Sequence, residues 1–255
     1  MESRETNQRE PLTLGSLFDG SGGFPLAGIL AGVEPVWASE IEPFAIRVTT
    51  KRLPKMQHYG DVSGISGTDL EPVDIITFGS PCQDLSIAGK RSGLDGSRSG
   101  LFYEAIRIVK EMREKTHGEK PRFIVWENVP GAFSSNKGED FKAVLEEIIR
   151  IKEPEAPPLP PPEKGRWPCA DCYLGDGWSM AYRVLDAQYW SVPQRRARIF
   201  LVADFAGGCA PEVLFKSEGV SGYTPQGFRQ GQGTAGDPEE SPGAAGGTDA
   251  GGRGR

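Results

Sequence analysis

Two kinds of hydrophobic pattern alternate along most of this chain. Short apolar runs end in turns rich in Gly, Ser and Pro, and between them apolar residues recur at helical spacing. The runs expected as strands are residues 12–18, 35–39, 58–62, 73–78, 122–126, 180–188 and 199–203, and the expected helices are 24–31, 42–52, 101–115 and 140–151. Alternating strands and helices predict an α/β fold, with a mostly parallel sheet covered by helices on both faces.

Three segments lack these patterns. Residues 152–168 carry seven prolines and are expected to be an extended, unpacked insertion. Glycine makes up twelve of the last 39 residues, and this segment has too little apolar content to form a core. We therefore expect one folded domain over residues 12–205, between a disordered tail (1–11) and a flexible Gly-rich tail (206–255).

Composition adds few constraints. Four cysteines do not make a disulfide framework, and no apolar run reaches transmembrane length, so we expect a cytoplasmic protein. The pair Cys169 and Cys172 is half of a zinc site, and no metal is expected. The net charge of −6 argues against an extended nucleic-acid surface, although a local basic face is compatible with it.

The first expected strand ends in a glycine turn, Asp19–Gly23, followed by a helix. This order opens many nucleotide-binding folds, and Glu40 follows Gly20 at about the spacing that puts a carboxylate on a ribose hydroxyl. Pro25 stands where a dinucleotide fingerprint has its third glycine. A nucleoside ligand therefore fits better than a dinucleotide, and a dinucleotide-dependent oxidoreductase is the alternative from another enzyme class.

Polar residues follow the later strands as well. Asp61 is a turn residue or an acceptor for an adenine amine, and Glu127 is a solvated or a catalytic carboxylate. Cys82 follows the central strand, where it is a buried thiol or a nucleophile. The basic cluster Gln194–Arg198 leads directly into the last strand, so part of it is expected to face a cleft.

Taken in order, these motifs resemble the C5-cytosine DNA methyltransferase family. The motifs are Phe18–Gly23, Glu40, Asp61, Gly79–Gln83, Glu127–Val129 and Gln194–Arg198, and they keep the order in which the family has them. The resemblance implies a Rossmann-like methyltransferase that uses S-adenosyl-L-methionine and acts on double-stranded DNA. It makes residues 12–205 the catalytic domain of a bacterial or phage-encoded enzyme of the restriction-modification type.

The resemblance also implies a role for individual residues. Those expected at the cofactor are Phe18, Asp19, Gly20, Gly22, Gly23, Glu40, Ile41, Asp61, Val62 and Pro81. Those expected to be catalytic are Cys82, Glu127, Arg196 and Arg198, and those expected at the substrate are Ser80, Gln83, Asn128 and Gln194. Cys82 adds to carbon 6 of a flipped-out cytosine, while Glu127 bonds the N3 of the ring.

The chain departs from the family after the last strand. The family continues into a target recognition domain, whereas the Gly-rich tail that follows here holds at most the start of one. The sequence therefore resembles a truncated methyltransferase, or one completed by a second chain. A cofactor-binding remnant without activity and an RNA cytosine methyltransferase are the alternatives.

Overall fold

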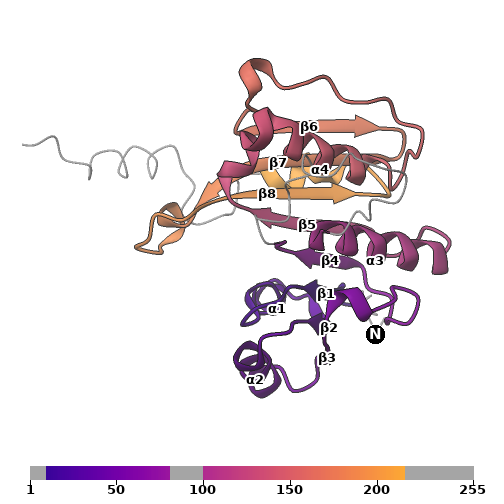
Figure 1. Cartoon of the computed structure of the whole chain (residues 1–255). Coiled ribbons are helices and arrows are strands. Elements are labelled where there is room, and N and C mark those ends of the chain that lie inside the picture. Colours follow the sequence, from indigo (N-terminus) through magenta and orange to yellow (C-terminus); the bar gives the residue numbers. More distant parts are fainter. Residues whose placement is uncertain (1–9, 81–99, 216–255) are drawn as a thin grey trace, which may run out of the picture.

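Eight strands form one sheet in the computed structural model, which describes residues 10–80 and 100–215 (Figure 1). The strands are β1 (Thr13–Leu17), β2 (Glu34–Ser39), β3 (Gln57–Tyr59), β4 (Ile75–Phe78), β5 (Phe123–Asn128), β6 (Ala170–Gly175), β7 (Trp178–Asp186) and β8 (Ala197–Asp204). Their order is β3-β2-β1-β4-β5-β8-β7-β6. The pairs among β1 to β5 are parallel, and those among β5, β8, β7 and β6 are antiparallel.

The helices cover both faces of this sheet, which confirms the expected fold class (Figure 1). They are α1 (Gly23–Leu30), α2 (Pro43–Arg52), α3 (Leu101–Lys115), α4 (Glu139–Ile149) and α5 (Cys209–Phe215). Short 3-10 turns connect them: η1 (Val62–Gly64), η4 (Pro130–Phe133), η5 (Ser135–Gly138), η6 (Glu163–Gly165) and η7 (Ala187–Trp190). Among the helices of the described residues, none has the length and apolar content needed to cross a bilayer.

The strand order reverses beside β1. The chain builds outward from β1 through β2 to β3, and then returns to place β4 on the other side of β1. The carboxyl ends of β1 and β4 therefore flank the point at which the winding direction changes. In open α/β sheets this is where ligands bind, because the loops on its two sides run in opposite directions.

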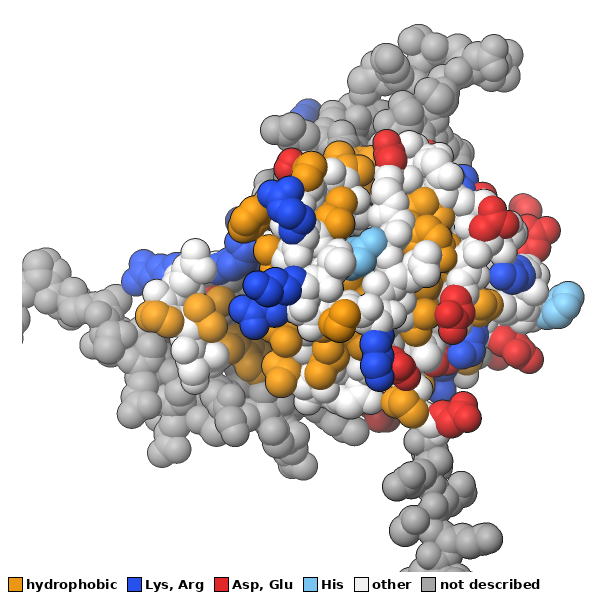
Figure 2. All heavy atoms as spheres, turned by 90° about the horizontal axis from the view of Figure 1, so that it is seen from below, with side chains coloured by type: hydrophobic (Ala, Val, Ile, Leu, Met, Phe, Trp, Pro, Cys, Tyr) orange, Lys and Arg blue, Asp and Glu red, His pale blue; other side chains and the backbone are white. Residues whose placement is uncertain are grey.

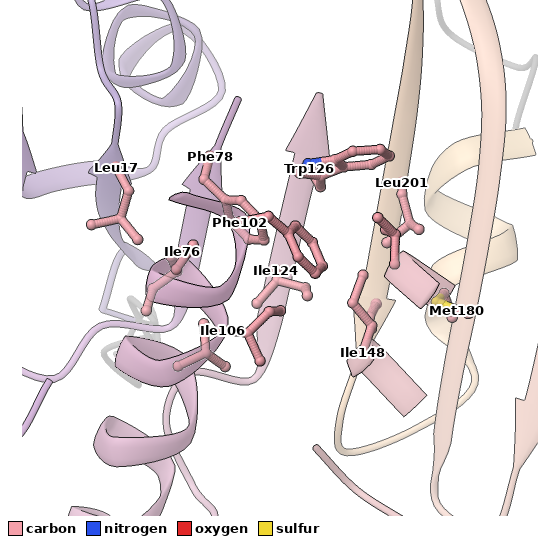
Figure 3. Close-up of a cluster of buried hydrophobic side chains, with 14 of the residues drawn as sticks. Leu17, Ile76, Phe78, Phe102, Ile106, Ile124, Trp126, Ile148, Met180 and Leu201 are labelled. Atoms are coloured by element: carbon pink, nitrogen blue, oxygen red, sulfur yellow. The ribbon is translucent and has the colours of Figure 1, made fainter. Parts of the chain in front are cut away.

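The larger part of the core lies between the sheet and helices α3 and α4. Phe78, Phe102 and Trp126 meet there, with ring centroids 6.2 Å apart in both the Phe78–Phe102 and the Phe102–Trp126 pair (Figure 3). On the opposite face α5 packs against Ala181 and Val202, which form a second, smaller core. Alternation of side chains along β7 and β8 supplies both cores from the same two strands.

The junction of α1 and α2 depends on a glycine. Gly22 precedes α1 with a φ of 86°, and a Cβ at this position would lie 2.8 Å from the side-chain methyl of Thr49 on α2. Both the positive φ and the close approach exclude a larger residue. The expected glycine turn therefore also brings the two N-terminal helices together.

The Pro-rich segment 152–168 is packed, in contrast to the prediction. The Leu159 N–H donates to Oε1 of Glu146 on α4 at 2.9 Å, and the Trp167 indole donates to the Gly138 carbonyl at 2.8 Å. Trp167 is only 7% exposed and contacts the main core. An extended segment still packs when its few large apolar residues meet a helix surface.

Two elements were not expected from the sequence. Strand β6 pairs with β7 at the edge of the sheet, where its exposed side chains give no hydrophobic signal. Helix α5 occupies residues 209–215, so the boundary expected at residue 205 is wrong and the described fold continues to Phe215. This short helix was not predicted because Gly207 and Gly208, directly before it, are typical of a turn and indicated the end of the domain.

Candidate functional site

A single glutamate joins the turns after β1 and β2. Oε2 of Glu40 accepts a hydrogen bond from the Gly20 N–H at 2.6 Å, and Oε1 accepts from the N–H groups of Ile41 and Glu42 at 2.8 and 2.9 Å. The spacing between Gly20 and Glu40 thus produces the proximity that the sequence predicted. Phe18 and Gly20 both have positive φ, 55° and 58°, so the chain turns sharply where β1 ends.

A buried carboxyl group lies within this turn. Asp19 is 7% exposed, and its Oδ1 accepts a hydrogen bond from the Ser16 hydroxyl at 2.7 Å. Its Oδ2 is buried without a hydrogen-bond partner among the described residues. Burial raises the pKa of Asp19 to about 6, assisted by the charge of Glu40 and opposed by the bond from Ser16. A buried oxygen of this kind is suited to a cationic ligand group.

The other residues expected at the cofactor differ in exposure. Ile41 is 69% exposed, whereas Val62 is 3% exposed and packs into the main core. Asp61 is exposed, and its Oδ1 accepts from the Ser63 N–H at 2.9 Å, which caps η1. The side chains of Ile41 and Asp61 are therefore accessible to a ligand, whereas the Val62 side chain is enclosed by the core. The expected cofactor contact of Val62 stays a prediction.

The end of β4 is fixed by two neighbours on β5. The Trp126 indole donates to the Ser80 hydroxyl at 3.2 Å, and the Asn128 amide donates to the Ser80 carbonyl at 3.3 Å. Ser80 and Asn128 are both 5% exposed. These groups are bonded to one another in the structure, and their expected contact with the substrate stays a prediction. Pro81, Cys82 and Gln83 lie outside the described residues.

The strand register brings a carboxylate and two arginines together. Glu127 pairs with Phe200 across β5 and β8. Arg198 lies two residues before Phe200 on β8, so its side chain is on the same face of the sheet. The Arg198 Nε lies 3.3 Å from Oε1 of Glu127, and Nη2 of Arg196 lies 3.7 Å from the same oxygen. These residues come from distant parts of the sequence and were predicted as a catalytic set. Gln194 is exposed in the turn before them.

The three charged side chains line a cavity of about 330 Å³, together with Leu185, Ala187, Trp190 and Phe200. This volume is at the lower end of the range for small-molecule sites, roughly 300–1,000 Å³. Trp190 and Phe200 were not among the expected site residues. The signal available was an aromatic residue on each side of the basic cluster.

Asp186 shapes the segment that carries the arginines. Its Oδ1 accepts hydrogen bonds from the Arg196 N–H at 2.9 Å and from the Gln188 N–H at 3.2 Å. The end of β7 is thereby tied to the start of β8. This residue was also not predicted.

The described residues contain no group of three His, Cys, Asp or Glu side chains suited to a metal. Cys169 and Cys172 are both exposed at the β6 edge. Figure 2 shows that charge is segregated on the face seen from below. Basic side chains cluster on the side where the carboxyl ends of the parallel strands lie, and most acidic ones lie on the opposite side. A net negative chain thus has a locally basic region.

The chain is similar to known methyltransferases. A sequence model of C-5 cytosine-specific DNA methylases matches residues 12–152. A protein of Escherichia phage P1, named DNA N-6-adenine-methyltransferase, is 34% identical over 233 residues, 82% of this chain and 31% of that protein. Type II methyltransferase M2.BsuMI of Bacillus subtilis (strain 168) is 32% identical over 188 residues, 74% of this chain and 41% of that protein. The chain thus spans about a third to two fifths of these relatives.

The fold has a counterpart among solved structures. The crystal structure of the S. pombe Dnmt2 methyltransferase aligns with a TM-score of 0.55 and 20% sequence identity. The alignment covers 85% of this chain and 57% of that one. At this identity the similarity supports the Rossmann-like methyltransferase fold and carries no further conclusion.

Proposed function

The chain belongs to the C-5 cytosine-specific DNA methylase family, and on this premise we propose that it methylates carbon 5 of cytosine in double-stranded DNA. The observation that carries the proposal is the contact of Glu127 with Arg198 and Arg196 in one cavity. Ser80 lies beside this group, since Asn128, the residue after Glu127, bonds its carbonyl. Cys82 follows Ser80 by two residues, a covalent reach of at most about 7 Å.

The methyl donor of this family is S-adenosyl-L-methionine, and the described residues suit it. Its positive groups match the unpartnered Oδ2 of Asp19, and its carboxylate matches the free N–H groups at the start of α1. Three backbone N–H groups already bond Glu40, whose carboxylate has about four acceptor positions. One position therefore remains for a ribose hydroxyl. Ile41 and Asp61 are accessible for the adenine.

The proposed chemistry follows from the low reactivity of carbon 5. The Cys82 thiolate adds to carbon 6, and the electron pair of the 5,6 double bond moves into the ring. Glu127 donates a hydrogen bond or a proton to N3, and Arg198 bonds the O2 of the base, so that the added electron density is stabilised. Carbon 5 would then bond the electrophilic methyl group of the cofactor, whose S–CH3 bond would break with S-adenosylhomocysteine as the leaving group. A base, most simply water, then removes the proton from carbon 5, and the thiolate departs.

Access to the base requires that the cytosine leave the DNA stack, as in other enzymes that modify bases. The basic side chains that cluster at the carboxyl edge of the sheet supply charge for phosphate contacts. We propose that sequence-specific DNA binding is supplied by a recognition domain, either of the same protein or of a second chain.

The test is methyl transfer from radiolabelled S-adenosylmethionine to double-stranded DNA, followed by digestion to nucleosides. Label in 5-methylcytosine is expected, with a loss of at least about 100-fold in Cys82→Ser. No transfer by the wild type, combined with saturable cofactor binding in calorimetry, would instead support an inactive remnant. Label in RNA but not in DNA would change the substrate class.

A second candidate comes from the name of the phage P1 relative, which specifies adenine. The same digest separates N6-methyladenine from 5-methylcytosine. Attack of an exocyclic amine on a methyl group needs no thiol, so the adenine reaction would continue in Cys82→Ser. Label in N6-methyladenine with both the wild type and Cys82→Ser would overturn the cytosine proposal.

A further inference from the structure

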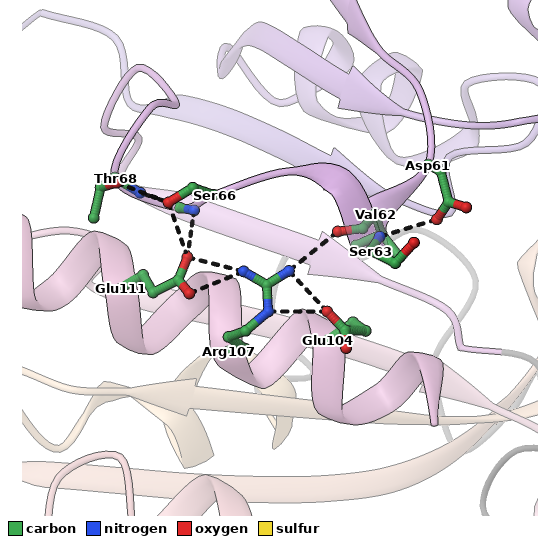
Figure 4. A network of polar contacts seen from close by, with 9 residues as sticks. Asp61, Val62, Ser63, Ser66, Thr68, Glu104, Arg107 and Glu111 are labelled. Atoms are coloured by element: carbon green, nitrogen blue, oxygen red, sulfur yellow. Dashed lines mark hydrogen bonds and ion pairs between the residues drawn. The ribbon is translucent and has the colours of Figure 1, made fainter. Parts of the chain in front are cut away.

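Arg107 connects three groups on the α3 side of the β3 loop (Figure 4). Its Nε and Nη2 donate to Oε2 of Glu104 at 2.9 and 2.7 Å, and its Nη1 donates to both oxygens of Glu111 at 2.9 and 3.0 Å. Its Nη2 also donates to the Val62 carbonyl at 3.2 Å. The guanidinium thus binds its own helix and, at the same time, the segment that follows β3.

Glu111 extends this connection along the same segment. Its Oε2 accepts a hydrogen bond from the Gly67 N–H at 2.6 Å and from the Ser66 hydroxyl at 3.3 Å. A Cβ at Gly67 would lie 2.4 Å from the Ile108 carbonyl oxygen, so the backbone rests directly on α3. Two points of one segment, Val62 and Gly67, are therefore held by one ion-pair network.

We propose that Arg107 is a positioning residue for the cofactor, because it holds the segment 61–68 on α3 and so fixes Asp61 at the carboxyl end of β3. The inference rests on the proposed function, which makes Asp61 a ligand of the adenine. Asp61 itself bonds Ser63 within η1, next to the Val62 carbonyl that Arg107 holds. Movement of that carbonyl would move Asp61 with it.

Arginine has the geometry that this position requires. Its planar group offers five donors in a fixed fork, enough to bond two carboxylates and a carbonyl together. Lysine offers a compact ammonium and cannot span the same three partners. Without a cation between them, the carboxylates of Glu104 and Glu111, which both contact this guanidinium, would also repel one another.

A matched control exists on α4. Arg150 pairs with Glu146 at 3.0 Å and with Glu147 at 3.3 Å, and its side chain is 31% exposed compared with 34% for Arg107. Both arginines therefore make helix-surface ion pairs with glutamates three and four residues away. Only Arg107 adds a contact to the segment after β3. The variant Arg150→Met removes an equivalent ion pair away from the proposed cofactor edge.

The experiment compares Arg107→Met, Arg107→Lys and Arg150→Met with the wild type. Calorimetry with S-adenosylmethionine is expected to show a Kd about tenfold higher for Arg107→Met, as when only a tenth of the molecules hold the binding conformation. The Kd of Arg107→Lys should lie between those of the wild type and Arg107→Met, and the Kd of Arg150→Met should stay within about twofold of the wild-type value. KM for the cofactor should rise with kcat nearly unchanged.

Hydrogen exchange gives a second readout that needs no cofactor. The Gly67 amide should exchange faster in Arg107→Met than in the wild type, and at the wild-type rate in Arg150→Met. Glu111→Gln, which retains the side-chain shape, repeats the test if Arg107→Met does not fold.

An unchanged Kd or unchanged Gly67 exchange in a folded variant would overturn this inference alone. If Kd rose as much in Arg150→Met as in Arg107→Met, the effect of Arg107 would be one of general stability and not of positioning Asp61. Absence of cofactor binding by the wild type would overturn the proposed function, and this inference with it.

Discussion

Arg198 and Glu127 meet across two antiparallel strands, with the Arg198 Nε 3.3 Å from Oε1 of Glu127. Arg196 approaches the same oxygen at 3.7 Å. Both ion-pair contacts fall on Oε1, and the second oxygen, Oε2, lies toward Gly79, where an added Cβ would be 3.4 Å away. Among the residues that the structure describes, the carboxylate is therefore held by one oxygen, which leaves the other for a ring nitrogen of the proposed substrate.

Replacing Glu127 by Gln should remove most of the activity and leave the fold intact. A glutamine keeps a similar shape but does not transfer a proton, and a positioned acid contributes about 10²- to 10⁴-fold to rate. We expect methyl transfer to fall by at least about 100-fold, with cofactor affinity within about twofold. Glu139→Gln, at the exposed start of α4, is the control. Activity near the wild-type level in Glu127→Gln would contradict the assigned role.

Asp19→Asn should stabilise the protein at neutral pH. The pKa of Asp19 is raised from 3.8 to about 6 in the folded state, chiefly by burial. The folded state then holds a proton that the unfolded state has lost, so stability falls as pH rises from 4 through 6. Above pH 7 the free energy of unfolding of the asparagine variant should exceed that of the wild type by at most about 3 kcal/mol, and near pH 4 this difference should vanish. Urea unfolding at both pH values measures this. An exposed control, Asp176→Asn, should show no such trend, and an equal gain at both pH values would contradict burial of the charged carboxylate as the cause.

Cofactor binding should release a proton from Asp19 near pH 6. A cationic group beside Oδ2 favours the carboxylate, so the proton present in the free protein is displaced. Affinity should therefore weaken as pH falls below 6, and Asp19→Asn should bind more weakly with a flatter pH dependence. Calorimetry in buffers of different ionisation enthalpy counts the released protons. No proton release in the wild type at pH 6 would show that the positive groups of the cofactor lie elsewhere.

Arg122→Met should destabilise the junction of β5 and β8 at the amino end of β5. Asp204 is fully buried and accepts from the Arg122 Nε and Nη2 at 2.9 and 3.1 Å. Burial alone would raise the pKa of Asp204, but the bonds from Arg122 and from backbone N–H groups hold it below the usual value. The stabilisation that this pair adds is therefore fully present above the pKa that Asp204 has in the unfolded state, and it is lost as the pH falls through the lower pKa of the folded state. Because Arg122 is half-exposed, we expect a cost of about 2 kcal/mol at pH 7, and less below pH 4.

The measurement is urea unfolding of Arg122→Met at the two pH values. Lys142→Met, which removes longer contacts of 3.8 and 4.0 Å on α4, serves as the control and should cost under about 1 kcal/mol. A cost independent of pH would indicate lost packing of the arginine stem in place of lost charge pairing.

The sequence predicted the elements that bury a regular apolar pattern. Helix α3 occupies residues 101–115 as expected, because its apolar side chains recur on one face. Strand β6 was missed because its exposed residues leave no alternation to detect. The packed Pro-rich segment was missed because its contacts depend on the chain folding back onto the preceding helix α4, where Leu159 and Trp167 meet it, and no periodic pattern signals such a return.

The site was predicted in its residue types and only partly in its contacts. The link between Gly20 and Glu40 followed from spacing, because a βαβ unit fixes where the second strand ends. The contact of Glu127 with Arg198 depends on β8 running opposite to β5, which no local pattern specifies. Arg107 was missed because charges on an amphipathic helix normally indicate a solvated face.

The reversed direction of β8 has a consequence for how this fold tolerates change. Six backbone pairings between β5 and β8, from Phe123–Asp204 to Asn128–Ile199, hold the two halves of the cavity in register. The Pro-rich segment, residues 152–168, contributes nothing to this pairing. An insertion or a break in that segment should therefore leave Glu127 and Arg198 in contact, so two co-expressed fragments cut there should reassemble through the sheet.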